Sequence, residues 1–396
     1  HITLLPIYIF ISYVCIKTAI KLSHFLKINM LIGAELVFGV LLIYNIAGII
    51  PVEIRKQETS QPEQVNLSPV TTEVGNIQRP DVYYIVLDET AAFNVIRTYW
   101  NYEKVDDFEN FLKNKGFFIA ENSKSKTYAT LIEIASRLNM QDMSSNEKGF
   151  TEQDWFEAIS NNKVMQIFKQ LGYTTITIDQ VHAPFGYVNK TPINADYNLT
   201  ADKTYSDILS FDEFFYLVFN RSMLRPLDDM VQQSFDPLIN QHRNNVLFFF
   251  DKLANLDSIA SPKFVYAQVL LTHIPLIFDE NGGEIDTKNH YNWNYYIESY
   301  KFEITKVTAL INAILAKADP SNLPIIIIQS DHGFRNIKDL PTSVLLPNYP
   351  EEYKYAILNA LLLPGYDISQ LPDNLNPIDT FIIIFDHYFN QDIPMQ

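Results

Sequence analysis

"PIIIIQSDHGF" (Pro324–Phe334) joins an uninterrupted apolar run to a carboxylate and an imidazole. Four consecutive isoleucines are typical of a β-strand that is buried on both faces of a sheet. The run continues through Gln329 and Ser330 directly into Asp331 and His332. A charged group at a buried strand end is costly without a partner. This stretch therefore predicts a functional site at the edge of a buried sheet.

Four further apolar runs predict strands of the same sheet: Asp81–Glu89, Tyr173–Asp179, Lys263–His273 and Tyr355–Gly365. Apolar residues at helical spacing lie between them, in the sets Phe108, Phe111, Leu112; Val164, Ile167, Phe168, Leu171; and Tyr300, Ile304, Val307, Ile311, Ile314, Leu315. Alternation of strands and helices predicts an α/β fold with a mainly parallel central sheet flanked by helices. Residues 200–260 are aromatic-rich and predict no particular element.

The N-terminal region is the most apolar part of the chain. Ile2–Ile20 and Ile28–Ile50 each approach the roughly 20 apolar residues that cross a bilayer. Lys17, Lys21 and Lys27 lie in or beside the turn between them, and the positive-inside rule places that turn in the cytoplasm. The chain after Ile50 is then extracytoplasmic, at a bacterial-type plasma membrane.

This interpretation divides the chain into three parts. Residues 1–50 form two transmembrane helices, residues 51–79 a polar linker, and residues 80–396 the extracytoplasmic domain. A cleaved signal peptide is the competing interpretation of the N-terminus. A buried helix is the competing interpretation of the first span, and further spans upstream are compatible with a chain that begins at His1.

Composition narrows the chemistry further. The chain carries a net charge of −16, whereas the first 50 residues hold three lysines and one glutamate, so the negative charge lies in the predicted extracytoplasmic part. Such an acidic domain is a poor nucleic-acid binder, because phosphates require a basic surface. The single cysteine, Cys15, excludes an intramolecular disulfide and a cysteine-based zinc site.

Three apolar runs end in groups that bind metals or exchange protons: Asp88 with Glu89, His273, and Asp331 with His332. Because ligands bind at the carboxyl ends of strands in open α/β sheets, we expect these groups to meet at one edge. A divalent cation, Zn²⁺, Mn²⁺ or Mg²⁺, would offset the buried charge. Taken singly, each residue has an ordinary explanation: a helix cap for Asp88, a turn for the Asp-His-Gly sequence, and packing for His273.

In combination and in order, several segments resemble the alkaline phosphatase/sulfatase superfamily, specifically its membrane-anchored branch with lipoteichoic acid synthases and phosphoethanolamine transferases. These segments are RPDVYYIVLDE (79–89), FENFLKNKGFFIAENSKSKTYATLIEIASRLNM (108–140), LLTHIPLIFDENGG (270–283), SDHGF (330–334) and YAILNALLLPG (355–365). The resemblance implies an alkaline phosphatase-like fold for most of the part after Arg79.

The resemblance also implies residue roles. One metal ion is held by Asp88, Thr130, Asp331 and His332, with Thr130 as the nucleophile at the start of a helix that runs to Met140. His273 lies in an L-x-H-x-P segment near the phosphate or the leaving group. The implied reaction is transfer or hydrolysis of a phosphodiester, with a lipid or lipid-linked donor and possible transfer to a glycan acceptor; no oligomeric state is implied.

Departures from the family pattern limit these expectations. The segment before Thr130 has neither the C/S-x-P-x-R pattern nor a cysteine, which disfavours formylglycine-dependent sulfate hydrolysis. Glu89 stands where relatives commonly have glycine, and Lys126 is either a phosphate contact or a solvated charge. A second metal has only Asp279 and Glu89 as nearby candidates. A monoester hydrolase and a metal-free assembly factor therefore remain alternatives.

Overall fold

The computed structural model describes residues 79–147, 149–179, 193–201, 228–338, 343–391 and 393, together with Lys17 and Lys21. The two predicted spans and the linker therefore lie outside the described residues, and the three-part division of the chain stays a prediction. Among the described residues, no helix combines the length and apolarity needed to span a membrane. The fold described below belongs to the compact unit Val65–Gln396.

A seven-stranded sheet with the order β2-β7-β6-β1-β5-β3-β4 forms the centre of this unit. Its strands are β1 (Val82–Leu87), β2 (Phe118–Ile119), β3 (Thr174–Asp179), β4 (Tyr197–Thr200), β5 (Lys263–Val269), β6 (Ile325–Ser330) and β7 (Asn359–Leu362). The inner strand β1 is parallel to β5 and β6, and β3 is parallel to β4 and β5. β7 runs antiparallel to β2 and β6. The prediction of a mainly parallel sheet is confirmed.

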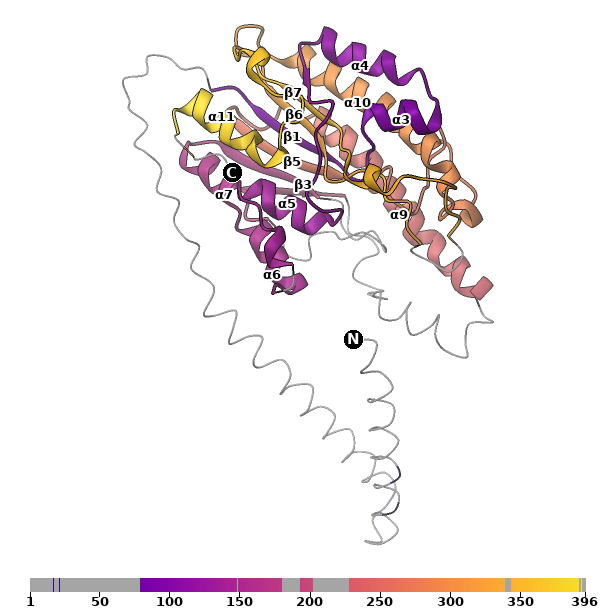
Figure 1. Ribbon diagram of the computed structural model, residues 1–396. Coiled ribbons are helices and arrows are strands. Elements are labelled where there is room, and N and C mark those ends of the chain that lie inside the picture. The colour runs from indigo at the N-terminus through magenta and orange to yellow at the C-terminus, as the bar shows by residue number, and fades with distance from the viewer. Residues whose placement is uncertain are drawn as a thin grey trace. The chain divides into compact units, whose positions relative to one another are not determined.

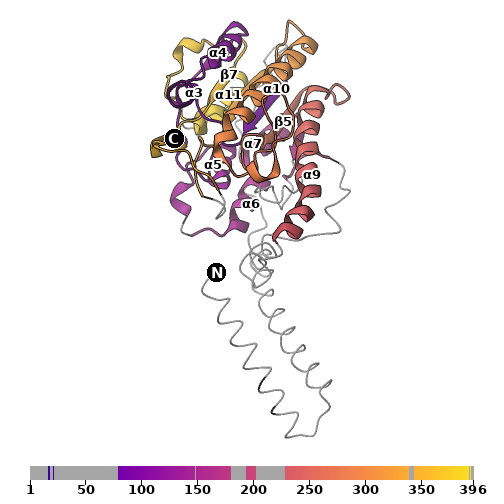
Figure 2. The same ribbon diagram turned by 90° about the vertical axis from the view of Figure 1, so that its right-hand side faces the viewer.

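Helices cover both faces of the sheet (Figures 1 and 2). They are α3 (Phe93–Trp100), α4 (Val105–Asn114), α5 (Thr130–Leu138), α6 (Glu152–Ser160), α7 (Lys163–Gln170), α9 (Asp228–Ala254), α10 (Tyr296–Lys317) and α11 (Thr380–Phe389). One apolar core lies between the sheet and α3, α4, α9 and α10, and the other between the sheet and α5, α6, α7 and α11. Strands buried between two helical layers need apolar residues at every position, which explains the four isoleucines of β6.

Local sequence explains where several helices begin. Thr151 caps α6 in a reciprocal arrangement with Asp154, and the Asn162 side chain caps α7 by accepting from the Met165 amide at 2.8 Å. In α4, Phe108 and Leu112 of the predicted apolar set are buried together with Val105, whereas Phe111 is half-buried.

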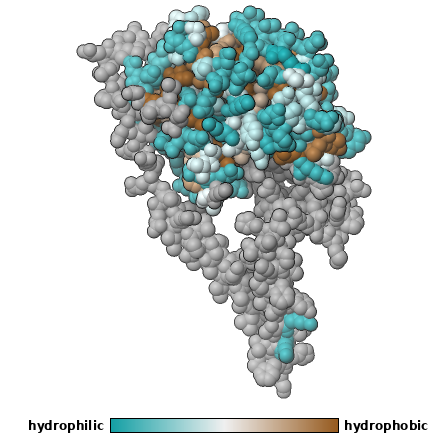
Figure 3. All heavy atoms as spheres, viewed as in Figure 1, coloured by the Kyte–Doolittle hydropathy of each residue, from teal (hydrophilic) through white to brown (hydrophobic). Residues whose placement is uncertain are grey.

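The structure also contains elements that the sequence patterns did not predict. β2 is two residues long and β4 four, and α9 occupies much of the region 200–260 that had been left unassigned. The strand predicted over Lys263–His273 ends at Val269, so Leu270–His273 is a loop. In Figure 3, hydrophilic residues cover most of the described part of the visible face, with smaller apolar patches between them.

Candidate active site and metal centre

Two neighbouring strands bring the predicted ligands together. β1 and β6 are parallel, and Leu87 is in register with Ser330, so the next residues, Asp88 and Asp331, follow at the same sheet edge. The Asp88 amide continues the pairing by donating to the Val269 carbonyl of β5 at 2.9 Å. The strand ends predicted from the sequence therefore do converge.

The side chains of Asp88, Asp331 and His332 form one candidate metal cluster. One ligand atom from each lies within 4.8 Å of the others, and all three residues are buried. Within the described residues, Asp88 Oδ1 and Asp331 Oδ2 have no hydrogen-bond partner. Two buried carboxylate oxygens without partners are costly unless a cation satisfies them. These residues fit a divalent cation.

Hydrogen bonds from neighbouring groups orient the three ligands. Gln268 Nε2 donates to Asp88 Oδ2 at 2.7 Å, and the amides of Glu89 and His332 donate to Asp331 Oδ1 at 3.0 and 2.8 Å. His332 Nδ1 lies 2.9 Å from the Gly333 carbonyl and must carry the proton that it donates there. With a cation bound, His332 Nε2 would present its lone pair as the ligating atom.

The two carboxylates repel each other in the ion-free state. Burial raises the pKa of Asp88 well above its ordinary value, and the nearby Asp331 raises it further. Burial also acts to raise the pKa of Asp331, but the charge of His332 and hydrogen bonds from the two amides and Thr130 outweigh it, so that pKa is lowered. The charged form of Asp88 is therefore disfavoured unless a cation lies beside it.

Thr130 lies beside this cluster, as the resemblance implied. It is the first residue of α5, and its Oγ1 is 3.4 Å from His332 Nε2, across 202 residues of sequence. The preceding residue, Ala129, gives the helix no side-chain cap. A helix N-terminus favours negative charge, so this position suits an approaching phosphate. The structure brings Thr130, Asp88, Asp331 and His332 together; their catalytic roles stay predictions.

A fully buried arginine attaches the helix of Thr130 to the strand end of Asp331. Arg137 donates to the Ser330 carbonyl at 2.7 Å and to the Asp331 carbonyl at 2.5 Å. Glu133, one turn earlier in α5, pairs with Arg137 and accepts from the Thr127 amide and hydroxyl at 2.6 and 3.0 Å. The sequence pattern of the segment 108–140 does not predict this role for Arg137.

Glu89, Arg335 and His273 form a second polar group next to the cluster. Glu89 has a left-handed backbone with φ 62°, the conformation that glycine adopts without strain and that a side chain makes costly by about 1 kcal/mol. Arg335 binds the Glu89 carboxylate with both Nε (3.0 Å) and Nη2 (2.8 Å). Burial acts to raise the pKa of Glu89, but the charge of Arg335 outweighs it, so the pKa is lowered and the carboxylate stays ionised.

His273 is held as a hydrogen-bond acceptor toward Arg335. Its Nδ1 donates to the Ile274 carbonyl at 2.5 Å, and its Nε2 accepts from Arg335 Nη2 at 2.8 Å. Burial, followed by the charge of Arg335, lowers the pKa of His273 to about 4. In this geometry both ring nitrogens of His273 are engaged, one with the Ile274 carbonyl and one with Arg335, and its role near the phosphate or the leaving group stays a prediction.

Two further candidates lie outside the clusters. Asp279 Oδ1 accepts from the amides of Asn281 and Gly283 at 2.8 and 2.6 Å, so this carboxylate holds a local turn. The Lys126 side chain is 52% exposed and its nearest acidic partner is Asp142 at 4.0 Å. That exposure favours a solvated charge over a phosphate contact.

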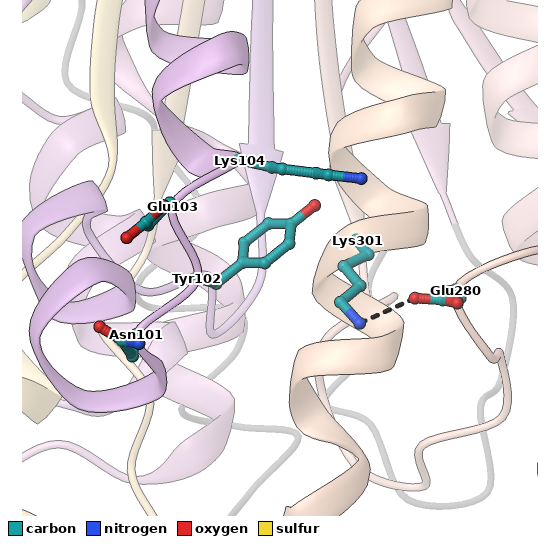
Figure 4. A pocket seen from close by; sticks show the side chains of 6 residues that line it. All are labelled: Asn101, Tyr102, Glu103, Lys104, Glu280 and Lys301. Carbon is teal, nitrogen blue, oxygen red and sulfur yellow. Dashed lines mark hydrogen bonds and ion pairs between the residues drawn. The ribbon is translucent and has the colours of Figure 1, made fainter.

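One surface depression of the described part lies away from this chemistry. It measures about 450 Å³ and is lined by Asn101, Tyr102, Glu103, Lys104, Glu280 and Lys301 (Figure 4). Lys301, on α10, points to Glu280 and binds it at 2.7 Å. None of the lining residues belongs to the cluster of Asp88, Asp331 and His332 or to the polar group of Glu89, Arg335 and His273. The depression therefore does not extend the site.

Comparisons with known proteins agree with the fold. The C-terminal periplasmic domain of EcEptC from Escherichia coli superposes with a TM-score of 0.50 at 16% identity, over 82% of this chain and 86% of that domain. The same domain in complex with Zn gives a TM-score of 0.50 at 14% identity, over 82% and 87% of the two chains. This chain shares its fold with the EcEptC periplasmic domain. The sequence itself matches no family model and no curated protein.

The site residues missed from the sequence are Arg137 and Arg335. Arg335 directly follows the quoted SDHGF segment, and an unusual Glu89 at a glycine position was the one available signal for it. Glu89 is a charged residue beside two proposed metal ligands and needs a partner. Its position in the sequence does not show which residue that partner is.

Proposed function

We propose that this chain is a metal-dependent phosphoryl-group transferase or hydrolase that acts on a phosphodiester through Thr130. The proposal rests mainly on the Thr130 hydroxyl, which lies 3.4 Å from His332 Nε2 beside two buried carboxylate oxygens without partners. A feeble nucleophile such as a threonine hydroxyl needs an activating group at this distance.

Asp88, Asp331 and His332, with Thr130 itself, would hold one divalent cation, Zn²⁺, Mn²⁺ or Mg²⁺. Such an ion lowers the pKa of a neighbouring hydroxyl and offsets the charge of the carboxylates. Imidazole with carboxylate ligands favours Zn²⁺ or Mn²⁺, and the EcEptC domain of similar fold has been solved with zinc.

The reaction divides into two displacements. Thr130 gives its proton to solvent and its Oγ1 attacks phosphorus, so the Oγ1–P bond forms while the bond to the leaving alkoxide breaks and that alkoxide takes a proton from water. Water or an acceptor hydroxyl then attacks the phosphothreonine and restores Thr130. The start of α5 stabilises negative charge on the phosphoryl group, and Arg137 fixes α5 to the metal-binding strand end. His273 acts by orienting Arg335, which presents its positive charge next to Asp88.

A lipid head group is the proposed donor. Two predicted transmembrane helices attach the domain to a membrane and keep it close to lipid-linked substrates, and the EcEptC domain of similar fold is periplasmic. We place the catalytic domain on the extracytoplasmic side for the same reason, with a glycan hydroxyl as one possible acceptor.

Mass spectrometry of the full-length chain after incubation with a membrane lipid extract tests the proposal. The expected result is a phosphoryl-containing adduct on Thr130, whose mass reports the transferred group. A chain that binds no divalent ion after repletion and forms no adduct would contradict the proposal and favour a metal-free assembly factor. Turnover of a phosphate or sulfate monoester without any phosphodiester activity would identify a monoester hydrolase instead.

A further inference from the structure

A second set of ligand-type side chains adjoins the proposed metal centre. Asp88, Glu89 and His273 each offer one ligand atom, and these atoms lie within 4.8 Å of one another. All three side chains are buried. Glu89 Oε2 and His273 Nε2 are 3.9 Å apart, a separation that two ligands of one metal ion with bonds of about 2 Å allow. By donor type and spacing, this set resembles a metal site.

The Arg335 guanidinium occupies the space between two of these ligands. Its Nη2 is 2.8 Å from Glu89 Oε2 and also 2.8 Å from His273 Nε2. Its Nε and backbone amide bind Glu89 Oε1 at 3.0 and 2.9 Å. An arginine remains protonated at all relevant pH values. A fixed positive charge therefore lies between groups that otherwise suit a metal ion.

The charges of the buried groups limit the number of divalent ions that the site can bind. Asp88, Glu89 and Asp331 supply three negative charges when ionised, and all three are buried. One divalent ion together with the Arg335 guanidinium neutralises them. A second divalent ion beside Arg335 would leave excess positive charge in a buried site, which is strongly unfavourable.

We propose that Arg335 takes the place of a second metal ion, and that Asp88, Glu89 and His273 form a latent site that binds Zn²⁺ once the guanidinium is removed. The inference rests on the proposed function, because it assumes that Asp88, Asp331 and His332 already bind one ion. It goes beyond that function by explaining why the site takes one ion and by naming the residue that sets the number.

The number of Zn²⁺ ions bound per chain tests the inference. The full-length chain is freed of metal with a chelator, dialysed against Zn²⁺ and measured by elemental analysis. We expect one ion for the wild type, two for Arg335→Met, and one again for the double variant Arg335→Met/Glu89→Gln. Arg97→Met removes an arginine that pairs with Asp106 and Glu109 on α4, and serves as the matched control with one ion.

The outcomes separate this inference from the function on which it rests. One ion in both the wild type and Arg335→Met overturns the inference and leaves the single-metal function standing. Two ions in the wild type also overturn it. No ion in the wild type overturns the single-metal site and this inference together. If Arg335→Met does not fold, Arg335→Gln, which is neutral but can still donate to Glu89, replaces it with the same expected second ion.

Discussion

Arg137 of α5 donates a hydrogen bond to the backbone carbonyl of Asp331, so the helix that carries the proposed nucleophile is fixed to the strand end that carries a proposed metal ligand. The two residues are 194 positions apart in the sequence, and the Arg137 side chain has no exposed surface. The position of Thr130 therefore depends on Arg137, a side chain that itself touches no substrate.

Replacing Thr130 with alanine should abolish turnover while the chain still folds. Loss of a nucleophile removes the covalent step, so we expect activity to fall by at least about 10³-fold. Thr130→Ser keeps a hydroxyl at the start of α5 and should retain measurable activity. Circular dichroism checks folding, and release of the alcohol product from a labelled phosphodiester measures turnover. Normal turnover by Thr130→Ala would contradict the mechanism.

Arg137→Met should destabilise the chain by about 3 kcal/mol or more, because Glu133 would remain buried without its cationic partner. The double variant Arg137→Met/Glu133→Gln should recover part of that loss. Urea unfolding measures the free energy of unfolding for each variant. Lys126→Met is the control on the same segment, and its half-exposed side chain predicts a change below about 1 kcal/mol. Equal effects of the two single substitutions would contradict the anchoring role of Arg137.

Glu303 should make the free energy of unfolding fall as the pH rises. This buried acid accepts hydrogen bonds from the hydroxyls of Thr90 and Thr272, and burial raises its pKa from 4.5 to about 8. The folded state therefore binds the proton more tightly than the unfolded state. The contribution of Glu303 to the free energy of unfolding is complete below about pH 4.5. It is lost as the pH rises to about 8, by up to about 1.4 kcal/mol per pH unit.

Glu303→Gln keeps the size of the side chain and removes its titration, so the variant should lose this slope. Unfolding free energies measured between pH 5 and pH 8 check the expectation. Glu147→Gln, at an exposed position, should keep the wild-type slope. A slope that is the same in Glu303→Gln and the wild type would show that Glu303 is not held as the neutral acid.

Asp88→Asn should have opposite effects with and without metal. In the presence of a chelator at pH 8 we expect a higher melting temperature than the wild type, because an amide at this position carries no charge for burial and Asp331 to disfavour. With Zn²⁺ added, the wild type should gain stability by ligand binding and the variant should gain little. Asp107→Asn, at an exposed position of α4, should follow the wild type in both conditions. A wild type that Zn²⁺ does not stabilise would contradict the metal centre.

Local sequence was sufficient for most of the sheet and for the metal-type ligands. Continuous apolar runs identify strands buried on both faces, and β1, β3, β5, β6 and β7 were all found in this way. Asp88, Asp331 and His332 directly follow such runs, so their meeting at one edge follows from parallel pairing. β2 and β4 escaped prediction because two and four residues are too short to establish a period.

The sequence by itself thus determined the layered α/β fold and the strand ends that carry Asp88, Asp331 and His332, because periodicity and burial are properties of neighbouring residues. Only the tertiary structure decided that Arg335 lies between Glu89 and His273 and that Arg137 binds the end of β6. From the sequence alone, an arginine in a loop or a helix is expected to be a solvent-exposed charge, because its partner is not known. The partners here lie some 60 to 250 residues away, and only chain folding brings such distant charges within hydrogen-bonding distance.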